Sequence, residues 1–168
     1  MKRLFLILSI ISFVIFIQGC SYSVFMNSFP HLRNIQIGTF DNETPEYTLA
    51  QDVQEHLVNS FQRDGRLRIT TIDPDSFIEG TVLDYLNEIS SYDIFGNVTE
   101  YRVSILLSVT FTDLRHNEVI YDNRTLRLSE TYSPNSDNPE LFTTEEQARQ
   151  RIFERVFETI IRSTLEAW

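Results

Sequence analysis

Few side chains in this 168-residue chain have the types and spacing that catalysis needs. Nucleophilic catalysis requires a serine, cysteine or threonine beside a base that a third group orients. The chain has one cysteine, Cys20, and three histidines in different settings: His31 in the N-terminal segment, His56 on a helical pattern and His116 in a predicted turn. It has no Gly-x-Ser-x-Gly motif and no glycine-rich phosphate loop. The sequence therefore predicts a binding or assembly protein, and not an enzyme.

Metal and cofactor sites are not predicted either. Glu55-His56 lacks a second histidine at helical spacing, and Asp73-Pro74-Asp75 lacks the glycine and the terminal glutamate of an EF-hand loop. A single cysteine excludes a cysteine-cluster zinc site and an intramolecular disulfide. We therefore expect no metal and no cofactor.

The residues before Cys20 explain this cysteine better than catalysis does. Lys2 and Arg3 form a short basic start, and residues 4–17 are apolar apart from two serines. A membrane-spanning helix needs about 20 apolar residues, so this shorter stretch is typical of a signal peptide. Ile17-Gln18-Gly19-Cys20 resembles the bacterial lipobox, whose cysteine receives lipid chains. We expect residues 1–19 to be removed and Cys20 to be lipidated; the alternative is an ordinary signal peptide that leaves a free cysteine.

The residue after the cysteine and the net charge bear on location and partners. Ser21 stands where an aspartate retains lipoproteins of enteric bacteria at the inner membrane, so the resemblance to these sorting rules favours the periplasmic face of the outer membrane. Removal of residues 1–19 takes Lys2 and Arg3 but no acid, so the formal charge falls by two, from −10 to −12. Such an acidic domain repels phosphates, and nucleic acid is not an expected partner.

Hydrophobic periodicity outlines the elements that must position these residues. Five strands are predicted, over residues 34–40, 67–72, 77–92, 99–112 and 119–132. One helix is predicted over residues 45–63, closed by Gly65. A second follows a loop over residues 133–141 and starts at Thr144, which forms a capping-box pattern with Gln147.

The strand over residues 99–112 has the clearest alternation. One face is apolar and carries Val103, Ile105, Leu107 and Val109. The other face is expected to meet solvent and carries Glu100, Arg102, Ser104, Ser108 and Thr110. We expect the apolar face to pack on two helices, against Leu49, Val53, Leu57, Ile152 and Val156. The expected fold is an α+β two-layer sandwich, in which a mixed, mostly antiparallel sheet has two helices packed on one face. It would occupy residues 34–168, after a lipidated N-terminal tether over residues 20–33.

Short motifs are spread over the mature chain. The first half contains Cys20-Ser21-Tyr22-Ser23, Ile37-Gly38-Thr39-Phe40-Asp41-Asn42-Glu43-Thr44, Arg63-Asp64-Gly65-Arg66-Leu67 and Glu79-Gly80-Thr81-Val82 with Tyr85. The second half contains Tyr92-Asp93, Gly96-Asn97-Val98-Thr99-Glu100-Tyr101-Arg102, Asp113, Tyr132 and Glu145-Glu146-Gln147-Ala148. Together these motifs resemble the lipopolysaccharide-assembly lipoprotein family, LptE.

The resemblance implies an outer-membrane lipoprotein that sits as a plug inside the LptD β-barrel, helps the barrel to assemble and contacts lipopolysaccharide. The expected partners are then an LptD-like outer-membrane β-barrel, lipopolysaccharide, and the membrane through the lipid anchor. Two alternatives remain: a lipid-anchored structural or scaffolding subunit of another envelope complex, and a lipid-anchored hydrolase.

Arginines are the candidate contacts for the phosphates of lipid A. Arg63, Arg66 and Arg68 lie within six residues of one another, and Arg66 and Arg68 would share a strand face because they are two apart. Arg115, beside His116 in a predicted turn, is the second candidate. The alternative is that these arginines are solvated or pair with nearby acids, namely Asp64, Asp73 and Asp75.

Overall fold

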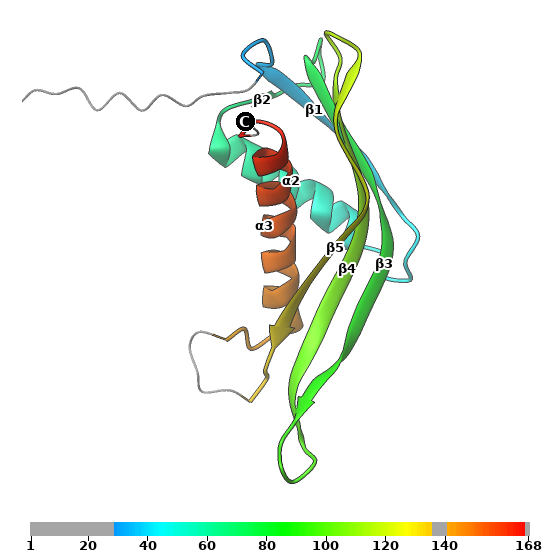
Figure 1. The fold of residues 1–168 in the computed structure, drawn as a ribbon, viewed down its shortest axis with the longest axis vertical. Coiled ribbons are helices and arrows are strands. Elements are labelled where there is room, and N and C mark those ends of the chain that lie inside the picture. Colours follow the sequence, from blue (N-terminus) through cyan, green and yellow to red (C-terminus); the bar gives the residue numbers. More distant parts are fainter. Residues whose placement is uncertain (1–28, 136–140, 167–168) are drawn as a thin grey trace, which may run out of the picture.

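The computed structural model describes residues 29–135 and 141–166 (Figure 1). The predicted signal peptide, the lipidation site Cys20 and the tether up to residue 28 lie outside the described residues. Leu32, which the sequence places in the tether, is buried in the core, so the end of this segment packs against the domain.

The described elements are five strands and two helices, in one two-layer arrangement. In chain order they are β1 (Asn34–Asn42), α2 (Leu49–Asp64), β2 (Arg68–Ile69), β3 (Ser76–Tyr92), β4 (Val98–Asp113), β5 (Glu118–Tyr132) and α3 (Glu145–Ser163). The sheet has the order β2-β1-β3-β4-β5; β1 is parallel to β2 and β3, and the pairs β3–β4 and β4–β5 are antiparallel. Both helices lie against one face of the sheet (Figure 1). The predicted α+β sandwich with a mixed sheet is confirmed.

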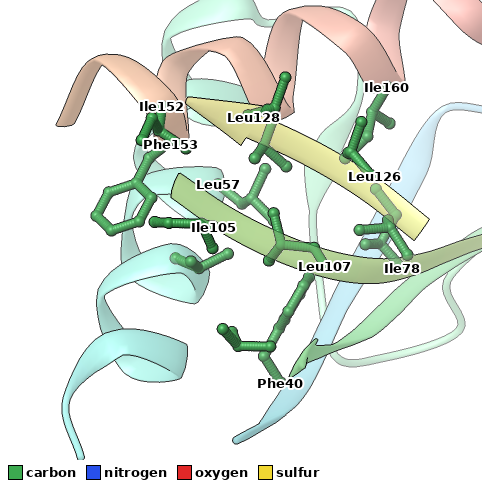
Figure 2. Close-up of a cluster of buried hydrophobic side chains, with 14 of the residues drawn as sticks. Phe40, Leu57, Ile78, Ile105, Leu107, Leu126, Leu128, Ile152, Phe153 and Ile160 are labelled. Carbon is green, nitrogen blue, oxygen red and sulfur yellow. The ribbon is translucent and has the colours of Figure 1, made fainter. Parts of the chain in front are cut away.

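The core lies between the sheet and the helices. Figure 2 shows Ile105 and Leu107 of β4 beside Leu126 and Leu128 of β5, together with side chains from both helices: Leu57 of α2, and Ile152, Phe153 and Ile160 of α3. All nine residues predicted to meet here are buried and belong to one hydrophobic cluster: Leu49, Val53, Leu57, Val103, Ile105, Leu107, Val109, Ile152 and Val156. The predicted apolar face of β4 is therefore the inner face of the sheet.

The helix predicted over residues 45–63 begins later, at Leu49, because side-chain hydrogen bonds hold the preceding turn. Asn42 Oδ1 accepts hydrogen bonds from the backbone N–H and the hydroxyl of Thr44, at 3.0 and 2.8 Å. Asn42 Nδ2 donates to the carbonyl of Glu46, at 2.8 Å. Such bonds offer the backbone an alternative to the helix. At the other end Gly65 closes the helix as predicted, with a φ of 72°.

The strand predicted over residues 67–72 is reduced to Arg68–Ile69. The hydroxyl of Thr70 accepts from the backbone N–H of Ile72 and lies within hydrogen-bond distance of its carbonyl, both at 3.1 Å, so the chain turns directly after the strand. The prediction that Arg66 and Arg68 share a strand face is therefore wrong, since Arg66 lies outside β2.

β3 and β4 form a long hairpin that extends beyond α3, at the bottom of Figure 1. The connection is the five-residue turn Asp93–Asn97, slightly longer than the tight turn predicted at residues 95–98. Asp93 Oδ1 accepts from the backbone N–H groups of Phe95 and Asn97, at 2.8 and 2.9 Å. These bonds, together with one from the Asn97 side chain, lower the pKa of Asp93.

Polar contacts join the start of α3 to this hairpin. The capping box predicted at Thr144 and Gln147 is present. Glu145 directly follows Thr144. Its carboxylate accepts hydrogen bonds from the hydroxyl of Tyr85 and from the Asn87 side chain, the latter at 2.7 Å. Burial, and then this hydrogen bond, raise the pKa of Tyr85. The N-terminus of α3 is therefore fixed both by its cap and by β3.

Neither helix in residues 29–135 and 141–166 combines the length and the apolar composition that a membrane span requires.

Candidate functional site

The face of the sheet that the helices leave uncovered carries short polar side chains. We call it the outer face; it consists of the residues of β3, β4 and β5 whose side chains point away from the helices, on the other side of the sheet from the core residues. Its serines and threonines are Thr81, Ser104, Ser108, Thr110, Thr112, Ser129 and Thr131. Charges of both signs lie among them, including Arg127 and Asp84, whose side chains approach to 3.9 Å. The outer face is thus mostly polar and of mixed charge, and it also carries apolar side chains, including Phe77, Leu86 and Leu106.

The outer face is less solvated than the sequence predicts. Of the predicted polar residues on β4, Arg102 is exposed, but Ser108 and Thr110 are half-buried and Ser104 is buried. Ser104 lies opposite Leu86 of β3, and cross-strand neighbours on one face are only about 4.5–5.5 Å apart. A short side chain is covered by longer neighbours at this spacing, so the expectation that Ser104 meets solvent is wrong.

The four candidate arginines do not form a single group. Arg66 pairs with Asp64 at 3.2 Å and with Glu166 at 2.8 Å. Arg115 pairs with two acids that lie just before β3, Asp75 at 2.6 Å and Asp73 at 3.1 Å. The pairing with Asp64, Asp73 and Asp75 that the sequence left as an alternative is therefore present for two of the four.

The other two arginines are differently placed. Arg63 bonds within its own helix, to the carbonyl of Asn59 at 3.3 Å and to the hydroxyl of Ser60 at 3.2 Å. The exposed side chain of Arg68 forms no ion pair or hydrogen bond within the part of the chain that the structure describes. Arg68 lines a hollow of about 330 Å³ together with Phe61, Leu67 and Ile69. A free, exposed guanidinium is suited to an anionic ligand.

His56 lies between the two helices. Its ring centroid is 5.9 Å from that of Phe153 in α3, and its Nε2 is buried with no hydrogen-bond partner among the described residues. Burial, and then the charge of Arg63, lower the pKa of His56. No nucleophilic side chain among the described residues bonds to His56, and a packing role fits this position better than catalysis.

His31 and His116, 85 residues apart, meet at the upper end of the sheet. His31 Nε2 lies 2.6 Å from Asp113 Oδ2, His116 Nδ1 lies 2.8 Å from the same oxygen, and the two nitrogens are 3.1 Å apart. Burial disfavours the carboxylate of Asp113, but hydrogen bonds from His116, His31 and the turn backbone outweigh burial and hold its pKa well below the usual range. Two imidazole nitrogens and a carboxylate oxygen are ligand types that bind zinc.

Sequence periodicity does not reveal this cluster. His31 precedes β1 and His116 follows β4, and only the pairing of β1 with β3 and of β3 with β4 brings these ends together. The sequence does show that both histidines lie at strand ends, but only the strand order shows that these two ends are neighbours. For this reason the sequence predicts different settings for His31 and His116, although the two rings are in contact.

The turn of the β3–β4 hairpin exposes apolar side chains. Ile94 is 93% exposed and Phe95 82% exposed, and Tyr92 beside them is also exposed. No helix covers this part of the hairpin (Figure 1). The hairpin turn was predicted, but its apolar exposure was not.

The sequence model of the LptE family, described as lipopolysaccharide-assembly, matches residues 32–164. No curated protein matches the sequence closely enough to count as a relative.

Several solved structures are similar in fold at low sequence identity. The hypothetical protein CT253 from Chlamydia trachomatis aligns with a TM-score of 0.57 at 10% identity, covering 81% of this chain and 99% of CT253. The uncharacterized lipoprotein B from Nitrosomonas europaea aligns with a TM-score of 0.50 at 17% identity, covering 78% and 81% of the two chains. PelC from Paraburkholderia phytofirmans, solved as a dodecamer, aligns with a TM-score of 0.51 at 12% identity, covering 79% and 88%. At these identities the similarity concerns the fold alone.

Proposed function

The chain belongs to the LptE, lipopolysaccharide-assembly, family, and on this premise we propose that it is an outer-membrane lipoprotein that plugs and helps to assemble an LptD-like β-barrel and contacts lipopolysaccharide. In this proposal Cys20 carries the lipid anchor, and the domain faces the periplasm and the barrel lumen. The role is one of assembly and binding, without enzymatic activity.

The polar composition of the outer face, together with the absence of a helix over it, is the observation that supports a barrel partner. The interiors of outer-membrane barrels are polar, so a plug needs a polar surface and not a large apolar patch. The outer face carries serines, threonines and charges of both signs, and no helix covers it (Figure 1). We therefore place the barrel contact on the outer face.

A bulky substitution on the outer face tests this contact. In Ser108→Trp, a large ring replaces a short half-buried side chain of β4, and we expect loss of the barrel from the co-purified complex. Asn59→Trp places the same ring on the exposed side of α2 and serves as the control, which should still co-purify with the barrel. Both variants should unfold within a few degrees of the unmodified protein.

Deletion of the chain should lower the amount of correctly assembled barrel in the outer membrane. Normal barrel levels and normal lipopolysaccharide export in a deletion strain would contradict the proposed function. Equal co-purification of both tryptophan variants would contradict the placement on the outer face, and the absence of any barrel from the complex would favour a scaffolding role in another envelope complex.

Lipopolysaccharide contact is proposed at the candidate arginines, with Arg68 as the first choice. Arg66 and Arg115 already pair with carboxylates, whereas Arg68 lies open beside the hollow lined by Phe61 and Leu67. In this proposal a lipid A phosphate pairs with the exposed guanidinium of Arg68 at the hollow. The net negative charge of the domain does not prevent this, because surface fields are screened over roughly 8 Å at physiological salt.

Reversal of one charge tests the lipid contact. Arg68→Glu should weaken lipopolysaccharide binding without changing the unfolding temperature, because the side chain forms no contact that the described fold requires. Arg124→Glu is the matched control: Arg124 is an exposed strand arginine whose Nε lies 3.3 Å from Asp122, and its reversal should leave binding unchanged. If both reversals reduce affinity equally, the effect is general electrostatics and the placement at Arg68 is wrong.

A further inference from the structure

Three ligand atoms converge where the start of the described chain meets the turn between β4 and β5. His31 Nε2, His116 Nδ1 and Asp113 Oδ2 lie 2.6, 2.8 and 3.1 Å from one another. The rings of the two histidines are 4.4 Å apart between centroids and nearly perpendicular, at 80°, so they approach edge to face and are not stacked. Each ring therefore directs a nitrogen toward the same small space as the carboxylate oxygen.

Asp113 is held rigidly by its own turn. Its side chain is 2% exposed, and its Oδ1 accepts the backbone N–H groups of Arg115 and His116, at 2.8 and 3.0 Å. The second oxygen, Oδ2, is left directed at the two imidazoles. Outer contacts that orient a ligand in this way are characteristic of metal sites.

Asp75 fixes the two chain segments that carry the histidines. Its Oδ2 accepts the backbone N–H groups of Arg33 and Asn34, at 2.9 and 2.8 Å, just after His31. Its Oδ1 accepts from Arg115 Nε at 2.6 Å, just before His116. One buried carboxylate therefore holds both ligand-bearing segments in place without occupying the space between the rings.

We propose that His31, Asp113 and His116 form a zinc site with an open fourth position, which joins the segment before β1 to the β4–β5 turn. Zinc binds imidazole nitrogen and carboxylate oxygen at about 2.0–2.2 Å, so tetrahedral ligand atoms lie about 3.3 Å apart. The three atoms need to separate by less than about 1 Å to admit the ion. His31 and His116 are 34% and 60% exposed, which leaves both rings room to move and leaves the fourth position open to solvent.

The ligand set selects among metals. Calcium takes six to eight oxygen ligands, and magnesium prefers an octahedral shell of oxygens, so two imidazoles disfavour both. Imidazole nitrogens suit zinc, and three protein ligands with an open position are its usual coordination outside closed structural sites. The surrounding charge is also favourable, because the carboxylates of Asp73, Asp75 and Asp113 outnumber the guanidinium of Arg115 in this network.

A metal ion at this site would join the segment before β1 to the β4–β5 turn at one end of the sheet. The β4–β5 turn and the start of β1 lie at the upper end in Figure 1, and the β3–β4 turn lies at the lower end. A metal bound there links residue 31 to residue 116 across two strand pairings, and thereby fixes where the N-terminal segment leaves the domain. The inference does not depend on the barrel partner or on lipopolysaccharide.

Zinc titration of the full chain, purified without a polyhistidine tag, tests the site. Calorimetry in a non-chelating buffer should show one zinc ion bound per chain. His31→Ala and His116→Ala should each weaken binding at least about tenfold, because each removes one of three ligands. His56→Gln removes the third histidine, which lies between the helices, and should bind zinc like the unmodified protein.

Thermal unfolding provides the second measurement. A ligand that binds only the folded state raises the unfolding temperature, so zinc should raise it and EDTA should reverse the rise. In EDTA, His31→Ala and His116→Ala should unfold below the unmodified protein, because each removes a hydrogen bond to the buried carboxylate of Asp113, and zinc should not raise their unfolding temperatures. The proposal is overturned if the unmodified chain binds no zinc, if either alanine variant binds as tightly as it does, if His56→Gln loses binding equally, or if calcium binds as well as zinc.

Discussion

Ile105 and Leu106 are neighbours in β4 whose side chains leave the sheet on opposite faces. Ile105 is fully buried among residues of the core, whereas Leu106 lies half-buried on the outer face. We expect Ile105→Ala to lower the free energy of unfolding by about 2–5 kcal/mol, through the lost transfer energy and the cavity that remains. Leu106→Ala should cost clearly less. Urea unfolding of both variants checks this, and equal losses would show that the faces are assigned wrongly.

His56 should make stability depend on pH in the weakly acidic range. Burial lowers its pKa in the folded state below the ordinary value of about 6.5, so the unfolded chain binds the proton more readily. The contribution to stability is therefore present above about pH 6.5 and is lost as the pH falls through the folded-state pKa.

His56→Gln removes this titratable group and leaves the other two histidines of the chain unchanged. From pH 7.5 to pH 5, the unfolding temperature of the unmodified protein should fall more steeply than that of His56→Gln. Parallel curves for the two proteins would mean that the buried position of His56 does not affect its protonation.

For individual residues, the sequence predicts which side chains are buried better than it predicts which side chains contact one another. The nine core residues were identified because alternation and helical spacing report which face of an element is apolar. The pairing of Arg115 with Asp73 and Asp75 was among the alternatives that the sequence offered. The meeting of His31 with His116, by contrast, depends on which strand ends are neighbours. Periodicity carries no information about strand order, so this contact could not be predicted.

The N-terminus of α3 is closed by a capping box. Thr144 Oγ1 accepts from the backbone N–H of Gln147 at 3.2 Å, and the Gln147 side chain bonds back to the backbone of the cap. Thr144→Ala should lower the free energy of unfolding by about 1 kcal/mol, since it leaves a helix donor without its partner. Thr144→Ser retains the hydroxyl and should cost much less, so equal losses in chemical denaturation would exclude the cap as the cause.

The ends of helices and strands can be predicted from the sequence where the hydrophobic pattern determines them. They cannot be predicted where the hydrogen bonds of a single side chain determine them. β3, β4 and β5 begin and end within a residue of the prediction, because long alternating strands fix their own limits. The start of α2 and the length of β2 are set by Asn42 and Thr70, which bond to nearby backbone. Such residues favour turns in general, but only the folded geometry shows which turn they close.

The two ends of the molecule differ in chemistry, and strand order is the reason. Pairing of β1 with β3 and of β3 with β4 places Ile35, Ser76 and Asp113 at one end, where charged and histidine side chains gather. The hairpin turn with Ile94 and Phe95 occupies the other end, beyond the helices (Figure 1). An elongated domain of this kind presents three separate surfaces: the histidine end, the apolar turn and the polar outer face.

For the whole molecule, the proposed anchor at Cys20 would decide where these surfaces act. The basic start, the short apolar stretch and Gly19 before Cys20 predict cleavage and lipidation at this residue. Cys20→Ala should therefore accumulate as the unprocessed precursor, whereas Ser21→Ala keeps the cysteine and should be processed like the unmodified protein. Because two or more acyl chains are needed for stable anchoring, the mature protein should carry a mass increase of that size on its N-terminal residue. Mass spectrometry of the membrane fraction measures this, and a mature N-terminus at any other residue would remove the anchor from the proposed function.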